Sequence, residues 1–354
     1  MKTKKLIKMP SIEQFRTVVS NVNRRVGYVG LDENGDAIYD HSRPKPVLTF
    51  KGTVKAHGTN AGVSYNNLDG IWYQSKEQII TPENDNAGFA FFANARKDIF
   101  IGIFKEFAEK NGIDLDNNSV TLYFEWAGGS IQKNVGLANL PKSAFIIGIK
   151  VSPFEVEGLE KQAPAYWLDS SDIRDTENSI YNIEDYETFT IDIDFNVPQL
   201  VQNKLIDLML AVEAECPIAK AFGFPNTTGE GIVWTYTDEE GTRYLFKVKG
   251  DKHAGKSKVK VIHKVDDAKL QKILDLAEVV TPTWRLAQML EQACDLNNGG
   301  QLDRSKLGDY IKLVIADVVK EDSDLIVEQG LELKDIAKYV NETAKRYFFE
   351  QETV

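Results

Sequence analysis

Residues 46–60 read PVLTFKGTVKAHGTN, and this stretch predicts a strand that runs into a glycine-containing turn. The segment PVLTFKGTV is rich in β-branched and apolar side chains, which favours the strand. Lys55 follows it, at the entry to the turn KAHGTN. A lysine in this position can act as a covalent nucleophile if its amine loses its proton, which burial or neighbouring cations favour. Because Lys-x-x-Gly is a common pattern, the alternative is an exposed lysine before a turn.

Further motifs along the chain strengthen the nucleophile interpretation. Glu125 begins EWAGG, where a carboxylate at a strand end precedes glycines that let a ligand approach the backbone closely. The overlapping loop GGSIQKNV (128–135) is polar and has no evident core role. Glu230 begins EGIV at the start of an apolar strand. In KVK (247–249) both ammonium groups share one face, because side chains alternate along a strand.

These residue types suit chemistry on phosphates. Lys247 and Lys249 offer positive charge to a phosphate and to a charged transition state, and their repulsion favours the neutral, nucleophilic form of Lys55. Glu230 is an oxygen ligand suited to hydrated Mg²⁺. Glu125 can accept a hydrogen bond from ribose hydroxyls. The structural alternative is that both glutamates are exposed strand-end carboxylates and both lysines are solvated charges.

The secondary-structure pattern divides the chain into two parts. Strands and helices are mixed up to about residue 262 without strict βαβ alternation, which predicts an α+β fold of antiparallel sheets with packed helices. From about residue 265 the pattern is helical throughout, which predicts a small all-α domain. We therefore expect domains at residues 1–264 and 265–354. The predicted strands are 46–54, 120–126, 144–151, 231–236 and 243–249, and the predicted helices before residue 265 begin at Ser11 and cover 87–110 and 199–214.

Charge is unevenly distributed over the 354 residues. The formal net charge of −11 argues against a nucleic-acid-binding protein. However, residues 242–264 carry eight basic groups and one acidic group, whereas residues 151–200 carry two and twelve. We therefore expect a basic cleft on an otherwise acidic protein, with RNA affinity that falls as salt rises. The alternative for the basic segment is a solvated edge strand whose lysines discourage pairing with other chains.

The chain shows no signal-peptide pattern and no apolar run of about 18 residues, so we expect a cytoplasmic protein without membrane association. In that compartment Cys216 and Cys294 are expected to be reduced.

In this order, the motifs resemble those of the covalent-lysine nucleotidyltransferases, which include ATP-dependent DNA ligases, RNA ligases and RNA capping enzymes. The resemblance covers roughly residues 45–260 and is greatest to the type 2 RNA ligases of phages and trypanosome editing complexes. Those ligases have Lys-x-His-Gly-Thr-Asn at the nucleophile, as in residues 55–60, whereas DNA ligases usually have Lys-x-Asp-Gly. They also have Gly-Glu-x-Ala-Gly followed by Ile-Gln-Lys-Asn-Val, and residues 125–135 closely match this segment.

The resemblance implies an ATP-dependent RNA ligase that uses Mg²⁺ or Mn²⁺. Lys55 would attack the α-phosphorus of ATP and expel pyrophosphate, which leaves a lysyl-AMP intermediate. The adenylate would pass to an RNA 5′-phosphate, and an RNA 3′-hydroxyl would then displace AMP and seal the strand, as in RNA repair. The expected substrate is a nick in duplex RNA or an RNA/DNA hybrid, and the expected oligomeric state is a monomer.

The resemblance also implies roles for individual residues. The catalytic set is Lys55, Lys247, Lys249 and Glu230, with Glu230 as the metal ligand. ATP or AMP would contact Val54, Lys55, Ala56, Asn60, Lys76, Glu125, Phe145, Glu230, Lys247 and Lys249. RNA or phosphate would contact His57, Gln132, Lys133 and Asn134.

The chain departs from the family pattern at two places. Where the family has an arginine before its central helix, this chain has Lys76, which cannot form a bidentate contact to a phosphate. The aromatic residue that stacks on adenine in the family aligns with either Phe145 or Gly148 in AFIIGIK. Three alternative functions remain: a DNA ligase, a capping guanylyltransferase and a non-catalytic RNA-binding relative.

Overall fold

The computed structural model describes residues 4–32, 34–129, 131–156, 158, 162–250, 266–296 and 300–352. It divides into two compact units, each described by itself below. The first unit contains residues 1–18, 48–193 and 204–262, and the second contains residues 19–47, 194–203 and 263–354. The predicted domain boundary between residues 264 and 265 lies outside the described residues and stays a prediction.

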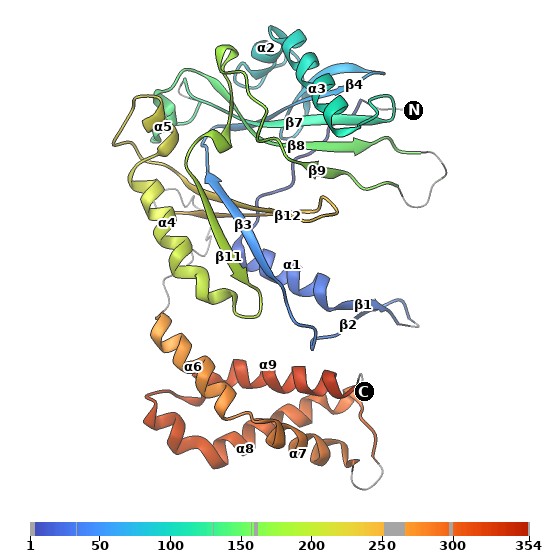
Figure 1. The fold of residues 1–354 in the computed structure, drawn as a ribbon, viewed down its shortest axis with the longest axis vertical. Helices are drawn as coiled ribbons and strands as arrows, with labels where there is room; N and C mark the ends of the chain where they lie inside the picture. The colour runs from blue at the N-terminus through green and yellow to red at the C-terminus, as the bar shows by residue number, and fades with distance from the viewer. Residues whose placement is uncertain are drawn as a thin grey trace. The chain divides into compact units, whose positions relative to one another are not determined.

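The first unit contains a seven-stranded sheet with the order β10-β8-β7-β4-β5-β6, and β9 also pairs with β8 (Figure 1). The pairs are antiparallel except that β10 runs parallel to β8. The strands are β4 (Thr59–Asn66), β5 (Gly70–Ser75), β6 (Ile79–Ile80), β7 (Asn118–Ala127), β8 (Ser143–Pro153), β9 (Tyr166–Leu168) and β10 (Ile180–Asn182).

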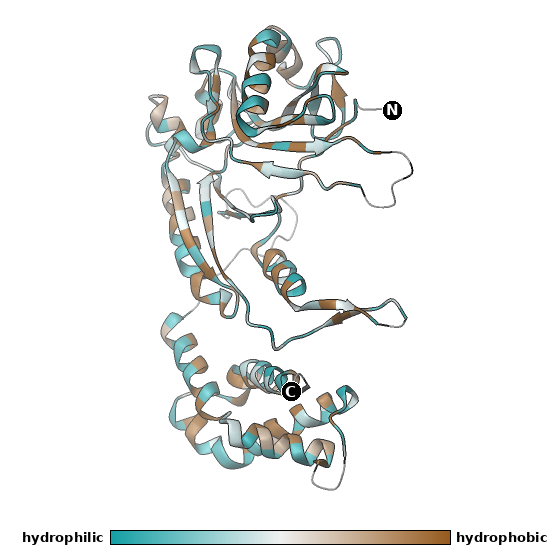
Figure 2. Cartoon of the chain, turned by 45° about the vertical axis from the view of Figure 1, so that its right-hand side comes forward, coloured by the Kyte–Doolittle hydropathy of each residue, from teal (hydrophilic) through white to brown (hydrophobic). Residues whose placement is uncertain are grey.

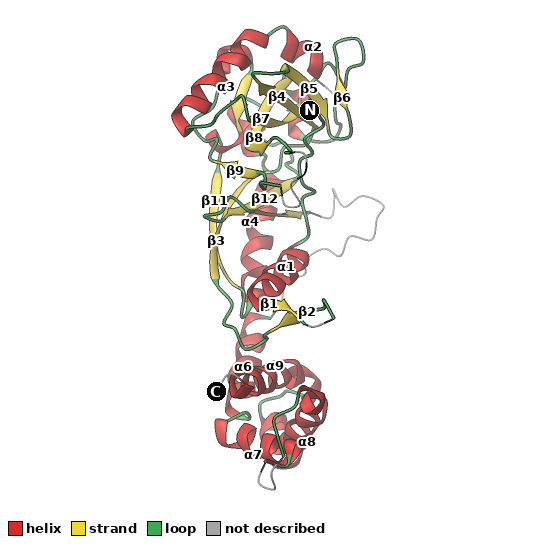
Figure 3. Cartoon of the chain, turned by 90° about the vertical axis from the view of Figure 1, so that its right-hand side faces the viewer, coloured by secondary structure: helices red, strands yellow, loops and turns green. Residues whose placement is uncertain are grey.

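Two helices cover one face of this sheet (Figure 3). They are α2 (Phe89–Asn94) and α3 (Lys97–Asn111), so the helix predicted over residues 87–110 is interrupted near Ala95 and Arg96. Phe100 and Phe104 of α3 are fully buried against Phe124 of β7 and its neighbours. This apolar core leaves the opposite face of the sheet free to carry the polar residues of a site.

A second sheet in the first unit has the order β11-β3-β12-β13. Its strands are β3 (Val47–Val54), β11 (Thr188–Asp194), β12 (Gly231–Thr237) and β13 (Arg243–Lys249). Alternation puts Phe50, Trp234 and Phe246 together on one face, where their rings are fully buried. Lys51, Lys247 and their alternating neighbours lie on the other face. Both sheets are predominantly antiparallel with packed helices, which confirms the predicted fold class.

The helix predicted to begin at Ser11 is wrong at its start. Helix α1 covers Phe15–Gly27, and the residues before it are extended. The backbone of Glu13 pairs with β13: its N–H donates to the Leu245 oxygen and its oxygen accepts from the Lys247 N–H, both at 3.1 Å. These bonds satisfy backbone groups of β13 that a cap at Ser11 would have left unpaired. Two further helices of this region are α4 (Gln202–Ala214) and α5 (Pro217–Ala221).

Helices form most of the second unit, as predicted for the C-terminal region. They are α6 (Asp267–Val279), α7 (Thr283–Cys294), α8 (Leu307–Glu328) and α9 (Leu333–Glu352). Helix α9 packs against α6 and α8 around buried Tyr310, Val340 and Phe348. Apolar and polar stretches alternate along these helices (Figure 2), as expected for amphipathic helices around one core.

The second unit also contains the short ribbon of β1 (Tyr28–Leu31) and β2 (Ala37–Tyr39). Among the described residues, every helix is too short or too polar to span a lipid bilayer.

Candidate active site

Lys55 stands directly after β3, and the backbone fixes its position. Its N–H donates to the Gly231 oxygen at 2.8 Å, which ties the end of β3 to the start of β12. The Lys55 Nζ lies 2.6 Å from Glu230 Oε2, although the two residues are 175 positions apart in sequence. Both side chains are largely enclosed, with exposed fractions of 17% for Lys55 and 4% for Glu230. The structure therefore brings the predicted nucleophile and the predicted metal ligand into direct contact.

Glu230 is the anionic centre of the site. Besides Lys55, its Oε2 lies 2.8 Å from His57 Nδ1, and its Oε1 lies 3.7 Å from Lys249 Nζ. Burial opposes ionisation of this carboxyl group, but the hydrogen bond from His57 and the charge of Lys55 outweigh it and lower the pKa of Glu230 to about 2. The carboxylate is thus ionised at neutral pH and holds three basic side chains around it.

Glu125 lies on the first sheet, on the face away from α2 and α3. The register of β4, β7 and β8 places Asn60, Glu125 and Phe145 directly opposite one another, so the three side chains project from the same face. Burial raises the pKa of Glu125, and the charge of Lys55 opposes this shift. Glu125 Oε1 accepts a 2.8 Å hydrogen bond from the Gly58 N–H, which anchors the turn that follows the nucleophile.

Lys247 and Lys249 share one face of β13, as their spacing predicts. Burial lowers the pKa of Lys247, and the charges of Lys249 and Lys55 lower it further. Lys76, at the turn after β5, also acts on Lys247 through its charge and is exposed. Lysines from three separate segments therefore gather at this site: Lys55 and Lys249 lie against Glu230, and Lys247 and Lys76 interact with this group through their charges. This concentration of positive charge favours binding of a polyanion.

The polar loop after β7 contacts the same turn. Gln132 Nε2 donates to the Gly58 oxygen at 3.0 Å, whereas Lys133 and Asn134 are exposed. Asn134 has a positive φ of 63°, which asparagine tolerates better than most residues. Ser130 of this loop lies outside the described residues. Asn60 Nδ2 lies 3.5 Å from Met9 Sδ, on the segment that precedes α1.

A cavity of about 730 Å³ lies within the first unit, between the two sheets. Lys55 and Glu125 line it, as do Val54 and Ala56, which flank the nucleophile. Sequence reasoning missed Ile147, Trp167, Glu184 and Arg243, which also line this cavity. Glu184 and Arg243 are not part of a recognisable sequence motif. Ile147 and Trp167 belong to strands in which most apolar residues would be compatible with the pattern, so the sequence does not mark them as site residues.

Phe145 is fully buried and does not line the cavity. Its ring packs against those of Tyr181, Tyr186 and Phe222, with centroids 5.7–6.2 Å away. On the same strand, Ile147 is the residue that faces the cavity. The adenine-stacking role of Phe145 stays a prediction, and it requires this aromatic cluster to open.

Comparison with known proteins identifies the family. The family model described as RNA ligase matches residues 49–249, which is more than half of the chain. This chain belongs to the RNA ligase family. The matched range contains every site residue expected from the sequence, from Val54 to Lys249.

Solved structures of a Naegleria gruberi RNA ligase are similar to this chain. They include the enzyme with PPi and a mutant with ATP and Mn, each at 15% identity and a TM-score of 0.41, and a mutant with AMP and Mn at 15% and 0.39. In each case 70% of this chain is covered, and this chain spans 57% of the Naegleria ligase chain. No curated protein matches the chain.

Gly58 has no room for a side chain. A Cβ at this position would lie 2.2 Å from the Trp126 backbone oxygen, and the strand that carries this oxygen cannot move freely. We predict that Gly58→Ala destabilises the protein by about 1–3 kcal/mol, as overpacking does, and displaces His57 from Glu230. Chemical denaturation with ATP-dependent labelling of the protein checks both effects.

Gly102→Ala is the matched control for this substitution. Gly102 lies on the exposed face of α3, and a Cβ there would meet no atom of the described residues within 4 Å. Alanine at this position should stabilise the protein by about 0.5–1 kcal/mol through helix propensity. Equal stability changes at both glycines would contradict the proposed tight turn at Gly58.

Proposed function

We propose that the chain is an ATP-dependent RNA ligase of the type 2 class that joins an RNA 3′-hydroxyl to a 5′-phosphate at a nick. The observation that carries this proposal is the contact of Lys55 with Glu230, which Lys249 also approaches, beside a cavity of about 730 Å³ that Lys55 lines. Membership of the RNA ligase family supports the reaction class. The proposed cosubstrate is ATP, the nucleotide present in one of the Naegleria structures.

The proposed reaction begins at Lys55. Its neutral Nζ forms a bond to the α-phosphorus of ATP, and the bond from that phosphorus to the pyrophosphate oxygen breaks. Lys247 and Lys249 neutralise charge on the triphosphate and on the transition state. An RNA 5′-phosphate oxygen then attacks the phosphorus of the adenylated lysine, and the lysine leaves as the amine. Finally, the RNA 3′-hydroxyl attacks the activated phosphorus, forms the phosphodiester and releases AMP.

Proton loss from Lys55 is the step that the site must control. In the present structure the Lys55 Nζ donates to Glu230, whereas attack on phosphorus needs a neutral amine with its lone pair directed at that atom. Binding of ATP brings a competing set of anionic oxygens next to Lys247 and Lys249. We infer that Lys55 must leave Glu230 before it attacks.

Glu230 would hold a hydrated Mg²⁺ or Mn²⁺. The described residues contain no cluster of three or more metal-ligating side chains. A single carboxylate fits this ion nevertheless, because Mg²⁺ keeps several waters and often binds through one carboxylate and substrate phosphates. When bound, the ion supplies charge that neutralises the triphosphate.

A sealing assay tests the proposal. The substrate is a nicked RNA duplex with one 5′-phosphate and one 3′-hydroxyl, incubated with the chain, ATP and Mg²⁺. We expect a joined strand on a denaturing gel and no joined strand without ATP. Sealing of a DNA nick at the same rate would favour the DNA-ligase alternative, and transfer of GMP in place of AMP would favour the capping alternative.

Salt dependence tests the basic cleft. We predict that RNA affinity falls as salt rises, with a slope in log K against log salt of about −0.9 for each neutralised phosphate of duplex RNA, by analogy with B-DNA. Lys249→Gln should reduce the magnitude of this slope by about one phosphate, whereas Lys110→Gln on exposed α3 should leave it unchanged. Binding that is insensitive to salt would contradict the cleft.

A further inference from the structure

The cavity beside Lys55 continues to a second group of charged side chains, which the proposed reaction does not use. Lys51 lies four residues before Lys55 on the same side of β3, a separation of about 13 Å along an extended strand. With Glu184 and Arg243 it lines the part of the cavity away from the nucleophile. Glu125 belongs to the Lys55 end of the cavity, because it accepts from the Gly58 N–H and the charge of Lys55 acts on it. A nucleotide with its α-phosphate at Lys55 and its ribose at Glu125 would therefore have the other end left for its base.

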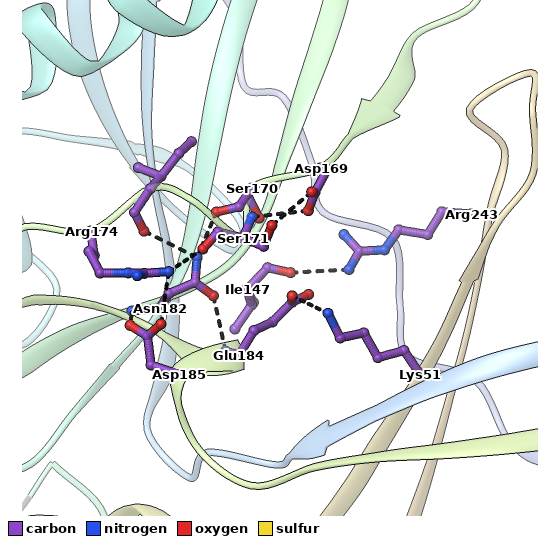
Figure 4. A network of polar contacts seen from close by, with 11 residues as sticks. Lys51, Ile147, Asp169, Ser170, Ser171, Arg174, Asn182, Glu184, Asp185 and Arg243 are labelled. Carbon is purple, nitrogen blue, oxygen red and sulfur yellow. Dashed lines mark hydrogen bonds and ion pairs between the residues drawn. The ribbon is translucent and has the colours of Figure 1, made fainter.

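Arg243 is an enclosed cation that forms no hydrogen bond to a carboxylate of the described residues. One Nη atom donates to the Ile147 oxygen at 3.2 Å (Figure 4). The guanidinium carbon lies 4.6 Å from the centroid of the Trp167 ring. Its Nε is buried and has no hydrogen-bond partner in the described part of the chain. Burial lowers the pKa of Arg243 to about 10, and nearby Glu184 opposes the shift. A buried donor without a partner is costly, and because Arg243 lines the cavity, its guanidinium favours an acceptor on a ligand bound there.

Gly148 makes room for this arginine. A Cβ at residue 148 would lie 2.3 Å from an Nη atom of Arg243, so a side chain there would collide with the guanidinium. The close approach of Arg243 therefore explains why AFIIGIK has a glycine at residue 148. The alignment of this position with the aromatic residue that stacks on adenine does not explain it.

Glu184 is held at the same end of the cavity by a stiff loop. Its N–H donates to Asn182 Oδ1 at 3.0 Å, and Asn182 Nδ2 donates to the Ser170 oxygen at 2.6 Å and the Ile173 oxygen at 3.1 Å. Asn182 is only 1% exposed. The Glu184 carboxylate forms an ion pair with Lys51 of β3 (Figure 4), and both residues line the cavity. The Glu184 carboxylate is therefore a hydrogen-bond acceptor held in a fixed position beside the Lys51 ammonium group, which is a donor.

The walls around these groups fit a flat ring. Ile147 and Trp167 line one side of the cavity and Val233 of β12 lines the other, so the sides are apolar while the end is polar. Pockets of this kind bind ligands through apolar contact and fix their orientation with a few polar groups. A purine has apolar faces and an edge with alternating donors and acceptors, and adenine presents an amine donor beside a ring-nitrogen acceptor.

We propose that Arg243 and Glu184 select the base of the nucleotide cosubstrate: Arg243 donates to a ring nitrogen of adenine, and Glu184 accepts from its exocyclic amine. The proposal rests on the proposed function, because it assumes that ATP binds with its α-phosphate at Lys55. Guanine has a carbonyl oxygen in place of that amine. This oxygen would face the Glu184 carboxylate without a proton between them, which disfavours GTP.

The experiment measures transfer of labelled adenylate from nucleotides to the protein, with KM and kcat determined separately. ATP is compared with 1-deaza-, 3-deaza- and 7-deaza-ATP and with purine riboside triphosphate, which lacks the amine. For the unaltered protein we expect one deaza analogue and the amine-free analogue to have a KM raised about 10- to 100-fold, as expected for loss of a hydrogen bond to a charged group. Equal KM values for all the analogues would overturn the proposal without any substitution.

Variants then assign each contact. Arg243→Met should raise the KM for ATP and remove discrimination against the same deaza analogue, with kcat little changed. Arg243→Lys keeps a cation but not the planar fork, so discrimination should be only partly retained. Glu184→Gln should remove discrimination against the amine-free analogue. Wild-type KM and discrimination in Arg243→Met would overturn the proposal.

Arg174→Met is the matched control. Arg174 lies in the segment between β9 and β10, 2.9 Å from Asp185, which is next to Glu184, but it does not line the cavity. If Arg243 only braced the two sheets, both arginine variants would lower thermal stability and leave analogue discrimination intact, which would contradict the proposal. A protein that accepts no adenylate from ATP at all would instead contradict the proposed function, so the two failures are distinguishable.

Discussion

Lys55→Ala should abolish transfer of adenylate from ATP to the protein but retain sealing of RNA that already carries a 5′-adenylate. Only the first proposed step forms a bond to the Lys55 Nζ, and the last step joins two RNA ends. We expect labelling to fall below detection, because no other amine lies against Glu230 at hydrogen-bond distance in the described residues. Parallel assays with ATP plus 5′-phosphorylated RNA and with pre-adenylated RNA separate the steps.

Lys110→Ala is the control for this substitution. Lys110 also pairs with a carboxylate, at 2.8 Å from Asp172, but it lies on exposed α3 outside the cavity. Exposed pairs of this kind contribute about 0–1 kcal/mol, so both activities should remain. Loss of pre-adenylated sealing in a folded Lys55→Ala protein would contradict the proposed division of the reaction into steps.

Glu230→Gln should be the most damaging substitution that preserves the size of the side chain. The amide would leave Lys55, His57 and Lys249 without their shared anion, and it is a poorer ligand for Mg²⁺. Removal of one preorganised electrostatic group typically costs about 10²–10³-fold in rate, so we expect a decrease of that size in adenylate transfer. Titration with Mg²⁺ should also show a higher metal requirement.

The same variant should change how stability depends on pH. The pKa of Glu230 is about 2 in the folded protein against an ordinary value of 4.5. The stabilisation from its ion pairs is therefore present above the ordinary value and is lost as pH falls toward 2. We expect Glu230→Gln to be destabilised by roughly 3 kcal/mol at neutral pH, with the gap to the unaltered protein closing below a pH of about 4.

Glu155→Gln provides the comparison. Glu155 also pairs with a lysine, Lys5, but its side chain is 71% exposed. It should therefore show little loss of stability and no loss of adenylate transfer. A Glu230→Gln protein with unchanged activity and an unchanged pH profile would show that the carboxylate is not the centre of the site.

The sequence predicted the site best where spacing and strand alternation determine geometry. The contact of Lys55 with Glu230 follows from two strands whose ends pair, and Lys247 and Lys249 share a face because their spacing is two. Glu125 could be placed because it ends a strand before glycines. The fold class followed from the mixed pattern of strands and helices, and the structure confirms it.

Side chains that act through tertiary contacts could not be predicted in this way. Arg243 belongs to the same basic strand as Lys247, and only the fold shows that its guanidinium is enclosed against Trp167. Phe145 and Ile147 are two residues apart and project from the same face of β8. Phe145 is nevertheless kept from the cavity by the rings of Tyr181, Tyr186 and Phe222, and a continuous apolar run in the sequence does not reveal this packing.

Mass spectrometry of the protein after incubation with ATP and Mg²⁺ tests the central claim most directly. The proposed lysyl-AMP intermediate predicts a mass increase equal to one adenylate, lost in acid and located by peptide mapping on Lys55. The modified fraction should fall when RNA with a 5′-phosphate is added. An unmodified protein, or an adenylate on a different residue, would contradict the account.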